Sequence, residues 1–149
     1  MGLFDAIGIA GTGLTAERMR MDVTAENLAN ADTTKGANGQ PYRRQSVLLA
    51  QSGTPGFSGA LSGALQEQTG AVPPGGVTVA GIVSDATPNR RVYDPSNPEA
   101  DAQGYVSMPN VDTVTEMTDL ISEQQSYQAD VTAMQTSKSM FTSTLGLLK

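Results

Sequence analysis

The sequence contains neither cysteine nor histidine among its 149 residues. The absence of cysteine excludes disulfides and thiol nucleophiles, and the absence of histidine removes the side chain that most often serves as a general base. Zinc and iron sites depend largely on the same two residue types, so nearly all such sites are excluded as well. We therefore expect a protein that is not an enzyme and that carries neither a cofactor nor a metal.

Apolar and aromatic residues are also scarce. Hydrophobic residues make up 38% of the chain and aromatic residues 5%, with no tryptophan, whereas there are 16 glycines and 8 prolines. This composition makes a compact core of ordinary size difficult to build, and it favours elongated helices with a small loop-rich module. The formal net charge of −6 opposes binding to phosphate groups. We expect neither nucleic acid nor a small-molecule substrate as a partner.

Long hydrophobic runs are absent too. The apolar stretch at residues 6–10 is far too short to cross a bilayer, and Asp5 lies where a secretory signal peptide carries positive charge. Ala6 occupies the position at which a myristoylation motif requires serine or threonine. If the protein leaves the cytoplasm, we expect it to do so without a cleaved signal peptide.

The last forty residues carry the strongest pattern, in which two sets of residues recur at every seventh position. The first set is Met117, Gln124, Val131, Lys138 and Leu145, and the second is Leu120, Tyr127, Met134, Phe141 and Leu148. This a/d heptad pattern predicts a helix over residues 111–147 that packs along other helices. Gln124 and Lys138 either fix the register among helices or lie at the solvent edge of a two-helix hairpin. Val114 and Ile121 add apolar surface outside the two stripes, which predicts an assembly face.

A second helix is predicted over residues 3–31. Ile7, Leu14, Met21 and Leu28 recur at every seventh position, and small or polar residues flank them, which favours close approach to a neighbouring helix. Each early glycine lowers helix propensity by roughly 1 kcal/mol relative to alanine, so we expect packing to order this helix. The same glycines do not form a dinucleotide-binding loop, because their order is wrong and no strand precedes them.

The segment between the helices predicts a small antiparallel β module. Strands are expected at residues 42–49, 77–83 and 90–93, which are rich in β-branched or aromatic side chains. The stretch at 51–76 is rich in glycine, serine, proline and threonine, and it predicts a loop with one helical turn at 61–67. Arg43 and Arg44 either hold a neighbouring acidic loop or lie at a solvated strand edge.

The expected fold class is therefore mainly α, with a small antiparallel β module between two long terminal helices that form a coiled-coil-like layer. The expected division places the N-terminal helix in residues 1–34, the loop-rich module in 35–107 and the C-terminal helix in 108–149.

An acidic stretch precedes the final helix. Asp94, Asn97, Glu99 and Asp101 could supply oxygen ligands to calcium, although their spacing differs from the twelve-residue EF-hand loop. A pair of these carboxylates could instead serve in glycosidic cleavage. The simpler interpretation is a rigid, solvated turn that leads through residues 105–106 to the final helix.

Several short motifs resemble a known family. The sequence NLANADT at 27–33, with LTA at 14–16, resembles the N-terminal signature shared by bacterial flagellar rod and hook proteins. Within that family, GQPYR at 39–43 is similar to the proximal rod type. The similarity continues in order along the chain, through GGV at 75–77, VYDP at 92–95, GYV at 104–106, MPNV at 108–111 and SYQA at 126–129.

The chain departs from the family pattern at three places. Gln125 stands where the family often has arginine, and Asp130 stands where it often has asparagine. Subunit contacts at these two positions are expected to differ. The stretch at 57–72 is longer than in typical members, and we interpret it as a surface insertion without an assigned function.

The resemblance implies a structural subunit of the flagellar basal body. Members of the family are exported through the flagellar type III apparatus, without cleavage, and polymerise through their terminal helices into the rod. The rod is the drive shaft that crosses the periplasm and transmits torque for motility. The implied partners are other copies of the chain, other rod proteins and the export apparatus.

On this basis the predicted assembly interface comprises residues of both terminal helices. They are Ile7, Leu14, Met21, Asn27, Leu28, Asn30, Met117, Leu120, Tyr127, Val131, Met134, Phe141, Leu145 and Leu148. Two other functions stay open from the residues alone. One is a soluble coiled-coil adaptor or chaperone of an export or assembly system, and the other is a wall-active enzyme that uses Asp94, Glu99 or Asp101.

Overall fold

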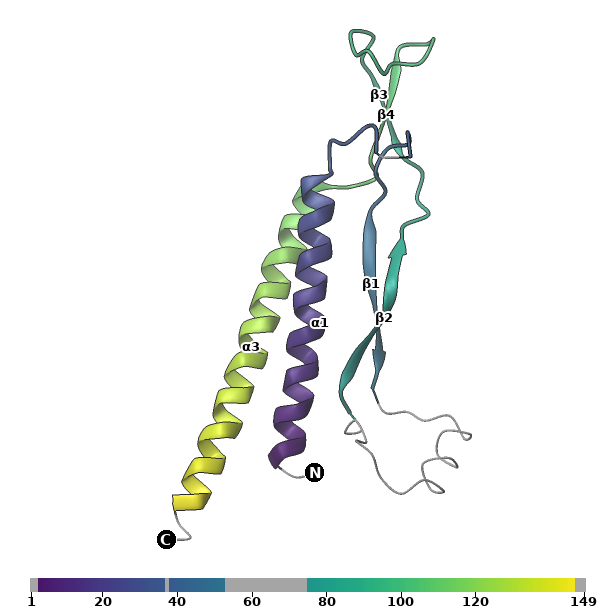
Figure 1. Ribbon diagram of the computed structural model, residues 1–149. Coiled ribbons are helices and arrows are strands. Elements are labelled where there is room, and N and C mark those ends of the chain that lie inside the picture. The colour runs from purple at the N-terminus through teal and green to yellow at the C-terminus, as the bar shows by residue number, and fades with distance from the viewer. Residues whose placement is uncertain (1–2, 37, 53–74, 147–149) are drawn as a thin grey trace, which may run out of the picture. The chain divides into compact units, whose positions relative to one another are not determined.

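The computed structural model describes residues 3–36, 38–52 and 75–146. The elements follow one another in the order α1 (Leu3–Ala29), β1 (Gln45–Gln51), β2 (Val77–Ser84), β3 (Arg90–Tyr93), β4 (Tyr105–Met108) and α3 (Thr113–Gly146) (Figure 1). The predicted fold class, two long terminal helices with a small β part between them, is confirmed. The predicted helical turn at 61–67 and the insertion at 57–72 lie outside the described residues. Within the described ranges, no helix is both long enough and apolar enough to cross a membrane.

Polar side chains end α1 and begin α3. The Asn30 side-chain amide donates to the backbone oxygen of Glu26 at 2.9 Å, and the Thr33 backbone N–H donates to the backbone oxygen of Asn30 at 3.1 Å. The second bond satisfies a carbonyl that the end of a helix leaves unpaired, and the first adds a side-chain bond to a carbonyl that also accepts the Asn30 backbone N–H. At the start of α3, Asp112 acts as the N-cap, because its side chain accepts a bond of 3.0 Å from the Val114 backbone N–H.

The strands form two separate two-stranded sheets, β1 with β2 and β3 with β4. The second sheet is antiparallel, with Arg90 opposite Met108 and Tyr93 opposite Tyr105. Residues 105–106, to which the expected turn leads, begin strand β4, and Val106 is buried. The sequence did not predict this fourth strand. A four-residue strand carries little signal of its own, and β4 forms because its partner β3 is available across the turn.

The described chain clusters into two compact units, each containing part of both helices. One consists of Met1–Arg18, Leu49–Ala80 and Gln125–Lys149, and the other of Met19–Leu48 and Gly81–Gln124. The three-part division expected from the sequence stays a prediction.

In the first unit, glycines on α1 lie against α3. A Cβ atom built on Gly13 would lie 2.6 Å from Oδ2 of Asp130, and one built on Gly11 would lie 3.8 Å from Cε of Met134. The Thr12 hydroxyl, one residue from both, accepts a bond of 3.1 Å from the backbone N–H of Val77 at the start of β2. Small residues on α1 therefore permit the close helix approach that the sequence predicted.

The inner face of α3 differs from the predicted seam in one respect. The second heptad set is half-buried where it is described, at Leu120, Tyr127, Met134 and Phe141. The residues buried beside it in the second unit are Glu116 and Glu123, whereas Met117, Gln124, Lys138 and Leu145 of the first set are exposed. Acidic side chains thus take the inner positions, and most of the first apolar stripe faces outward.

The turn between β3 and β4 gives the first testable prediction. Gly104 has φ +82°, and a Cβ atom there would lie 2.9 Å from Cε2 of Tyr93, so Gly104→Ala should cost about 1–3 kcal/mol through backbone strain and this contact. Amide hydrogen exchange at Val92 and Val106 is expected to accelerate about tenfold or more. The matched control is Gly81→Ala, because a Cβ atom at Gly81 meets nothing within 4 Å. Equal exchange rates in the two variants would contradict the prediction.

Candidate functional site: a buried polar network

Asn27 lies at the centre of a polar network in the second unit, and only 1% of its surface is exposed. Its amide nitrogen donates to the backbone oxygen of Gln45 at 2.8 Å and to Oε2 of Glu116 at 2.9 Å. Its carbonyl oxygen accepts bonds from the Tyr42 hydroxyl at 2.9 Å and from the Gln45 backbone N–H at 2.8 Å. These four bonds use both donors and both acceptor sites of the amide. One side chain therefore connects α1, the segment that enters β1, and α3.

Glu116, which is also 1% exposed, carries the charge of the network. Its Oε1 accepts a bond of 2.5 Å from Nε of Arg44, and Nη2 of Arg44 lies 3.4 Å from Oδ2 of Asp119. The hydrogen bond to Glu116 raises the pKa of Arg44, so the guanidinium is charged at neutral pH. The Asn110 side chain also fixes the backbone of this arginine, because it accepts a bond of 2.8 Å from the Arg44 backbone N–H. The buried carboxylate thus has an opposite charge and two hydrogen-bond donors.

A second acidic contact lies one heptad further along α3. The Thr24 hydroxyl donates to Oε1 of Glu123 at 3.2 Å, and Nη2 of Arg20 lies 3.4 Å from the same oxygen. Arg20 precedes Asn27 by seven residues on α1, and Glu123 follows Glu116 by seven on α3. The two pairs therefore share one antiparallel register within this unit.

The network specifies register more than it adds stability. Desolvation offsets much of the attraction within a buried ion pair, but the loss of one partner leaves a charge or amide unpaired in the interior. A slip of α3 by one turn would remove both helix-to-helix carboxylate contacts at once. The network therefore makes the observed register of α1 against α3 much more favourable in free energy than a register shifted by one helical turn.

The sequence pattern did not predict most of this arrangement. Asn27 was selected as an assembly residue, whereas the structure places it in the interior of one chain. Arg44 pairs with Glu116 and Asp119 on α3, and the charge of Asp85 in the loop after β2 also acts on it. Arg43 is exposed. The available signal was the recurrence of Glu116 and Glu123 at heptad spacing, beside the apolar set.

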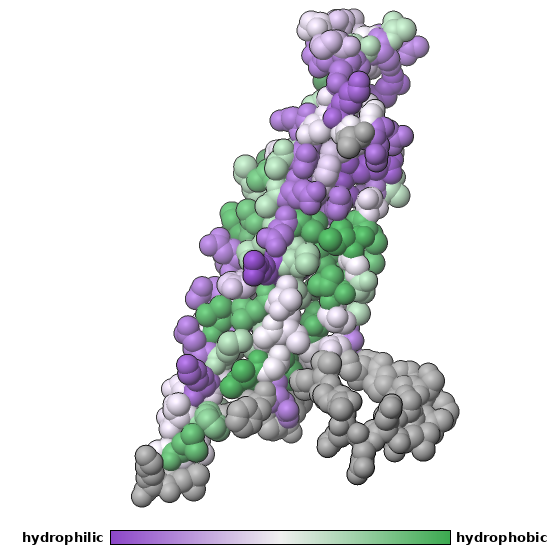
Figure 2. All heavy atoms as spheres, in the orientation of Figure 1, coloured by the Kyte–Doolittle hydropathy of each residue, from purple (hydrophilic) through white to green (hydrophobic). Residues whose placement is uncertain are grey.

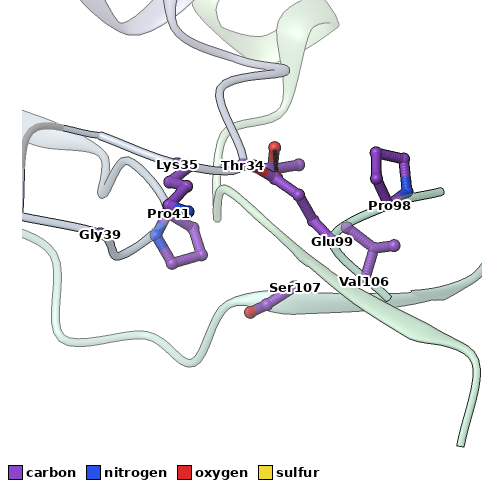
Figure 3. Close-up of a pocket in the computed structure, with 8 residues that line it drawn as sticks. All are labelled: Thr34, Lys35, Gly39, Pro41, Pro98, Glu99, Val106 and Ser107. Carbon is purple, nitrogen blue, oxygen red and sulfur yellow. Dashed lines mark hydrogen bonds between the residues drawn. The ribbon is translucent and has the colours of Figure 1, made fainter. Parts of the chain in front are cut away.

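The acidic stretch at 94–101 forms local turns. Asp94 accepts bonds from the backbone N–H and hydroxyl of Ser96, which hold the pKa of Asp94 below its usual range. Asp101 pairs with Arg91 at 2.5 Å, and Glu99 accepts a bond from the Thr34 hydroxyl (Figure 3). In the part of the chain that the structure describes, no three acidic side chains group in a way that could hold a metal ion.

The other predicted assembly residues take three kinds of position. Met117 and Leu145 are exposed, and Leu148 lies outside the described residues. The half-buried members are Ile7, Leu14, Met21, Leu28, Asn30, Leu120, Tyr127, Val131, Met134 and Phe141. Their role in assembly stays a prediction.

Comparison with known proteins gives matches at both ends of the chain. Residues 7–37 match the family described as flagella basal body rod protein, and residues 102–147 match the family described as flagellar basal body rod FlgEFG protein C-terminal. Asn27 falls in the first matched region and Glu116 in the second.

Three relatives that match this chain over nearly their full length share the same name. The chain is 44% identical over 147 residues to the flagellar basal-body rod protein FlgC of Escherichia coli O6:H1, covering 99% of this chain and 98% of that protein. It is 43% identical over 153 residues to FlgC of Bacillus subtilis, covering 100% of both chains. It is 42% identical over 155 residues to FlgC of Borreliella burgdorferi, covering 100% of this chain and 99% of that one.

The network predicts a large difference between two asparagines on one helix. Asn27→Ala should lower the free energy of unfolding by about 3 kcal/mol, because it removes four hydrogen bonds and leaves buried partners unpaired. Asn30→Ala, three residues later, removes an exposed bond to the Glu26 backbone oxygen and a bond of 3.2 Å from the Thr33 hydroxyl. It should cost only about 1 kcal/mol, because these groups can bond to water instead. Urea unfolding of both purified variants measures the loss of unfolding free energy. Similar unfolding midpoints in the two variants would contradict the larger contribution predicted for Asn27.

Tyr42 predicts a pH effect. Burial, followed by the charges of Glu26 and Glu116, raises the pKa of Tyr42 to about 12 from 10.0. Because the fold favours the neutral phenol, this contribution to stability is complete below pH 10 and is lost as the pH rises through 12. Ultraviolet titration should show a tyrosine component with a midpoint near pH 12 that disappears in Tyr42→Phe. A wild-type titration without that component would contradict the assignment.

Proposed function

The chain belongs to the FlgC family of flagellar basal-body rod proteins, and from this premise we propose that it builds the proximal part of the rod through its two terminal helices. It is a structural subunit of the flagellar basal body. We assign it no catalytic role. Its proposed task is to transmit torque through many modest contacts between subunits.

The exposed apolar face of α3 is the observation that carries the proposal. Val114 is 71% exposed and Ile121 is 58% exposed, and Met117 lies between them on the same side of the helix. Hydrophobic side chains interrupt the hydrophilic surface of this helix in Figure 2. A contiguous apolar face of this kind indicates an interaction site, and each such side chain gains roughly 1.5–3 kcal/mol in transfer free energy when it is buried.

Helices of neighbouring subunits are the proposed occupants of this face. The heptad spacing of α3 suits packing against further helices, and repeated contacts that do not close generate a filament. Both features support a rod in which each chain contributes its helix pair to a shared helical layer. Other copies of the chain and other rod proteins are the proposed neighbours.

The buried polar network supports the mechanical part of the proposal. A shaft transmits torque only if the elements within each subunit do not slide past one another under load. The contacts of Glu116 with Asn27 and Arg44, and of Glu123 with Thr24 and Arg20, oppose such sliding within the second unit. Rigidity inside the chain would then complement the apolar contacts between chains.

Export is proposed on the family relationship. We place the assembled subunit in the rod that spans the periplasm, delivered without a cleaved signal peptide by the flagellar type III export apparatus. The apparatus is thus a proposed partner in addition to the rod proteins.

The exposed face gives a direct test of assembly. Met117→Asp places a charge in the apolar stripe and should reduce rod assembly and swimming more than tenfold, while the unfolding free energy of the isolated subunit changes by less than about 1 kcal/mol. Swimming halos and the yield of isolated basal bodies measure the effect in cells that carry the variant as their sole copy.

The matched control is Thr115→Asp, which adds the same charge two residues earlier on the opposite side of α3. Thr115 is exposed, so this variant should swim almost normally. Normal assembly of Met117→Asp, or equal losses in the two variants, would argue against the proposed face.

A further inference from the structure

An aromatic side chain projects from the β3–β4 hairpin. Tyr93, at the end of β3, is 64% exposed although its ring packs edge-on against that of Tyr105, with centroids 5.3 Å apart. The guanidinium of Arg91 lies 4.9 Å from the centroid of the Tyr105 ring and pairs with Asp101. Tyrosine and arginine are the residue types most enriched at the energetic centres of protein interfaces.

This projection is held in place before any partner arrives. The Tyr93 ring lies against Gly104, where a Cβ atom would be 2.9 Å from the ring. The cross-strand contact with Tyr105 restrains the same ring from the neighbouring strand. An exposed side chain with few alternative positions loses little entropy on binding.

A hollow of about 310 Å³ lies elsewhere in the same unit, between the loop after α1 and the hairpin. Figure 3 shows Lys35 and Pro41 on one side of it and Pro98, Glu99 and Val106 on the other. The two prolines and the valine supply apolar walls, and the lysine and glutamate supply polar groups. This volume is at the lower end for ligand pockets, and it suits one inserted side chain better than an extended ligand.

We propose that Tyr93 of one copy of this chain inserts into the hollow of a second copy, with Asp94 of the first copy pairing with Lys35 of the second. The tyrosine ring would pack on Pro41 and Pro98, and its hydroxyl would donate to the Glu99 carboxylate. The inference rests on the proposed function, since it supplies a contact between neighbouring subunits of the rod.

Charge complementarity identifies a second copy as the occupant. Asp94 directly follows Tyr93, and its hydrogen bonds from Ser96 keep it anionic at neutral pH. Lys35 is exposed at the rim of the hollow, and no carboxylate among the described residues pairs with it. The projection therefore carries Asp94 beside Tyr93, and the hollow offers Lys35 at its rim as an opposite charge and Glu99 as an acceptor for the tyrosine hydroxyl.

The geometry of the contact is head to tail. The projection and the hollow are different surfaces of one chain, so each bound copy still presents a free projection or a free hollow. Contacts of this heterologous kind extend as an open helical array unless the rotation closes them into a ring. A two-stranded hairpin is also marginally stable alone in water, so a covering neighbour would stabilise it.

Cross-linking in assembled basal bodies tests the proposal. Because the sequence contains no cysteine, the introduced cysteines are the only thiols of this chain. Cells whose sole copy is the Lys35→Cys/Asp94→Cys variant are treated with a short thiol-reactive cross-linker, and a ladder of dimers and larger multimers is expected. Two single variants expressed together should give dimers only. The matched control Arg43→Cys/Asp94→Cys replaces another exposed cation of the same unit and should give no ladder.

The role of the ring is measured in the same cross-linking background. Adding Tyr93→Ala should lower the multimer yield at least tenfold, whereas Tyr93→Phe should retain most of it because the ring remains. Equal yields from these two variants would overturn the insertion of Tyr93.

Charge reversal covers the case in which the cysteine variants fail to assemble. Lys35→Asp and Asp94→Lys should each reduce swimming several-fold, and the double reversal Lys35→Asp/Asp94→Lys should restore it. A missing ladder, a single cross-link to a rod protein of different mass, or a double reversal that fails to restore swimming would overturn the inference. If rods still assemble when one of these results is obtained, only the hairpin contact is overturned and the proposed function stands. Normal assembly of the Met117→Asp variant would instead argue against the helix contacts of the proposed function.

Discussion

The hydrogen bond between the amide of Asn27 and the carboxylate of Glu116 is the interaction on which the second unit depends. It joins α1 to α3 at 2.9 Å, and the remaining bonds of the same amide reach Tyr42 and Gln45. A side chain with four matched partners in a water-free interior allows one arrangement of the segments around it, because any other leaves several polar groups unpaired. The start of β1 is thereby fixed to the helix pair.

The inner side of α3 combines a half-buried apolar stripe with buried acidic side chains, and other apolar side chains of the same helix stay exposed. Glu116 and Glu123 are buried, whereas Val114 and Ile121 are mostly exposed on the same helix. A polar interior gives specificity with little net stability, and the exposed apolar side chains retain transfer free energy that only a neighbour can release. In such a subunit the register between α1 and α3 is well defined, but part of the apolar surface is left exposed. Both properties suit a building block of a filament.

The β3–β4 hairpin exposes a restrained aromatic side chain, which the proposed contact between copies would use. Four-residue strands cannot bury a large core, yet Gly104 and Tyr105 restrain the exposed ring of Tyr93. Arg91 lies over the ring of Tyr105 in turn. Two-stranded elements need support from other surfaces. The outer face of α3 and the hairpin therefore both leave large side chains exposed, Val114 and Ile121 on the helix and Tyr93 on the hairpin.

Much of the fold was readable from the sequence, and the reason is that its signals are local. Heptad periodicity predicted both helices to within two residues at each end, and three strands followed from their β-branched and aromatic runs. The motif around Asn27 identified the family. The sequence could not show that β4 pairs with β3, or that Asn27 faces inward, since both depend on residues distant along the chain.

The site was readable only in part, for the same reason. Heptad counting identified the half-buried stripe from Leu120 to Phe141, but it paired that stripe with Met117 and its outward-facing repeats instead of with Glu116 and Glu123. Sequence alone determined that this chain forms long helices, contains neither cysteine nor histidine and belongs with rod proteins. Only the tertiary structure decided which face of each helix turns inward, because that choice is made by matching hydrogen-bond donors and acceptors across segments that the sequence holds far apart.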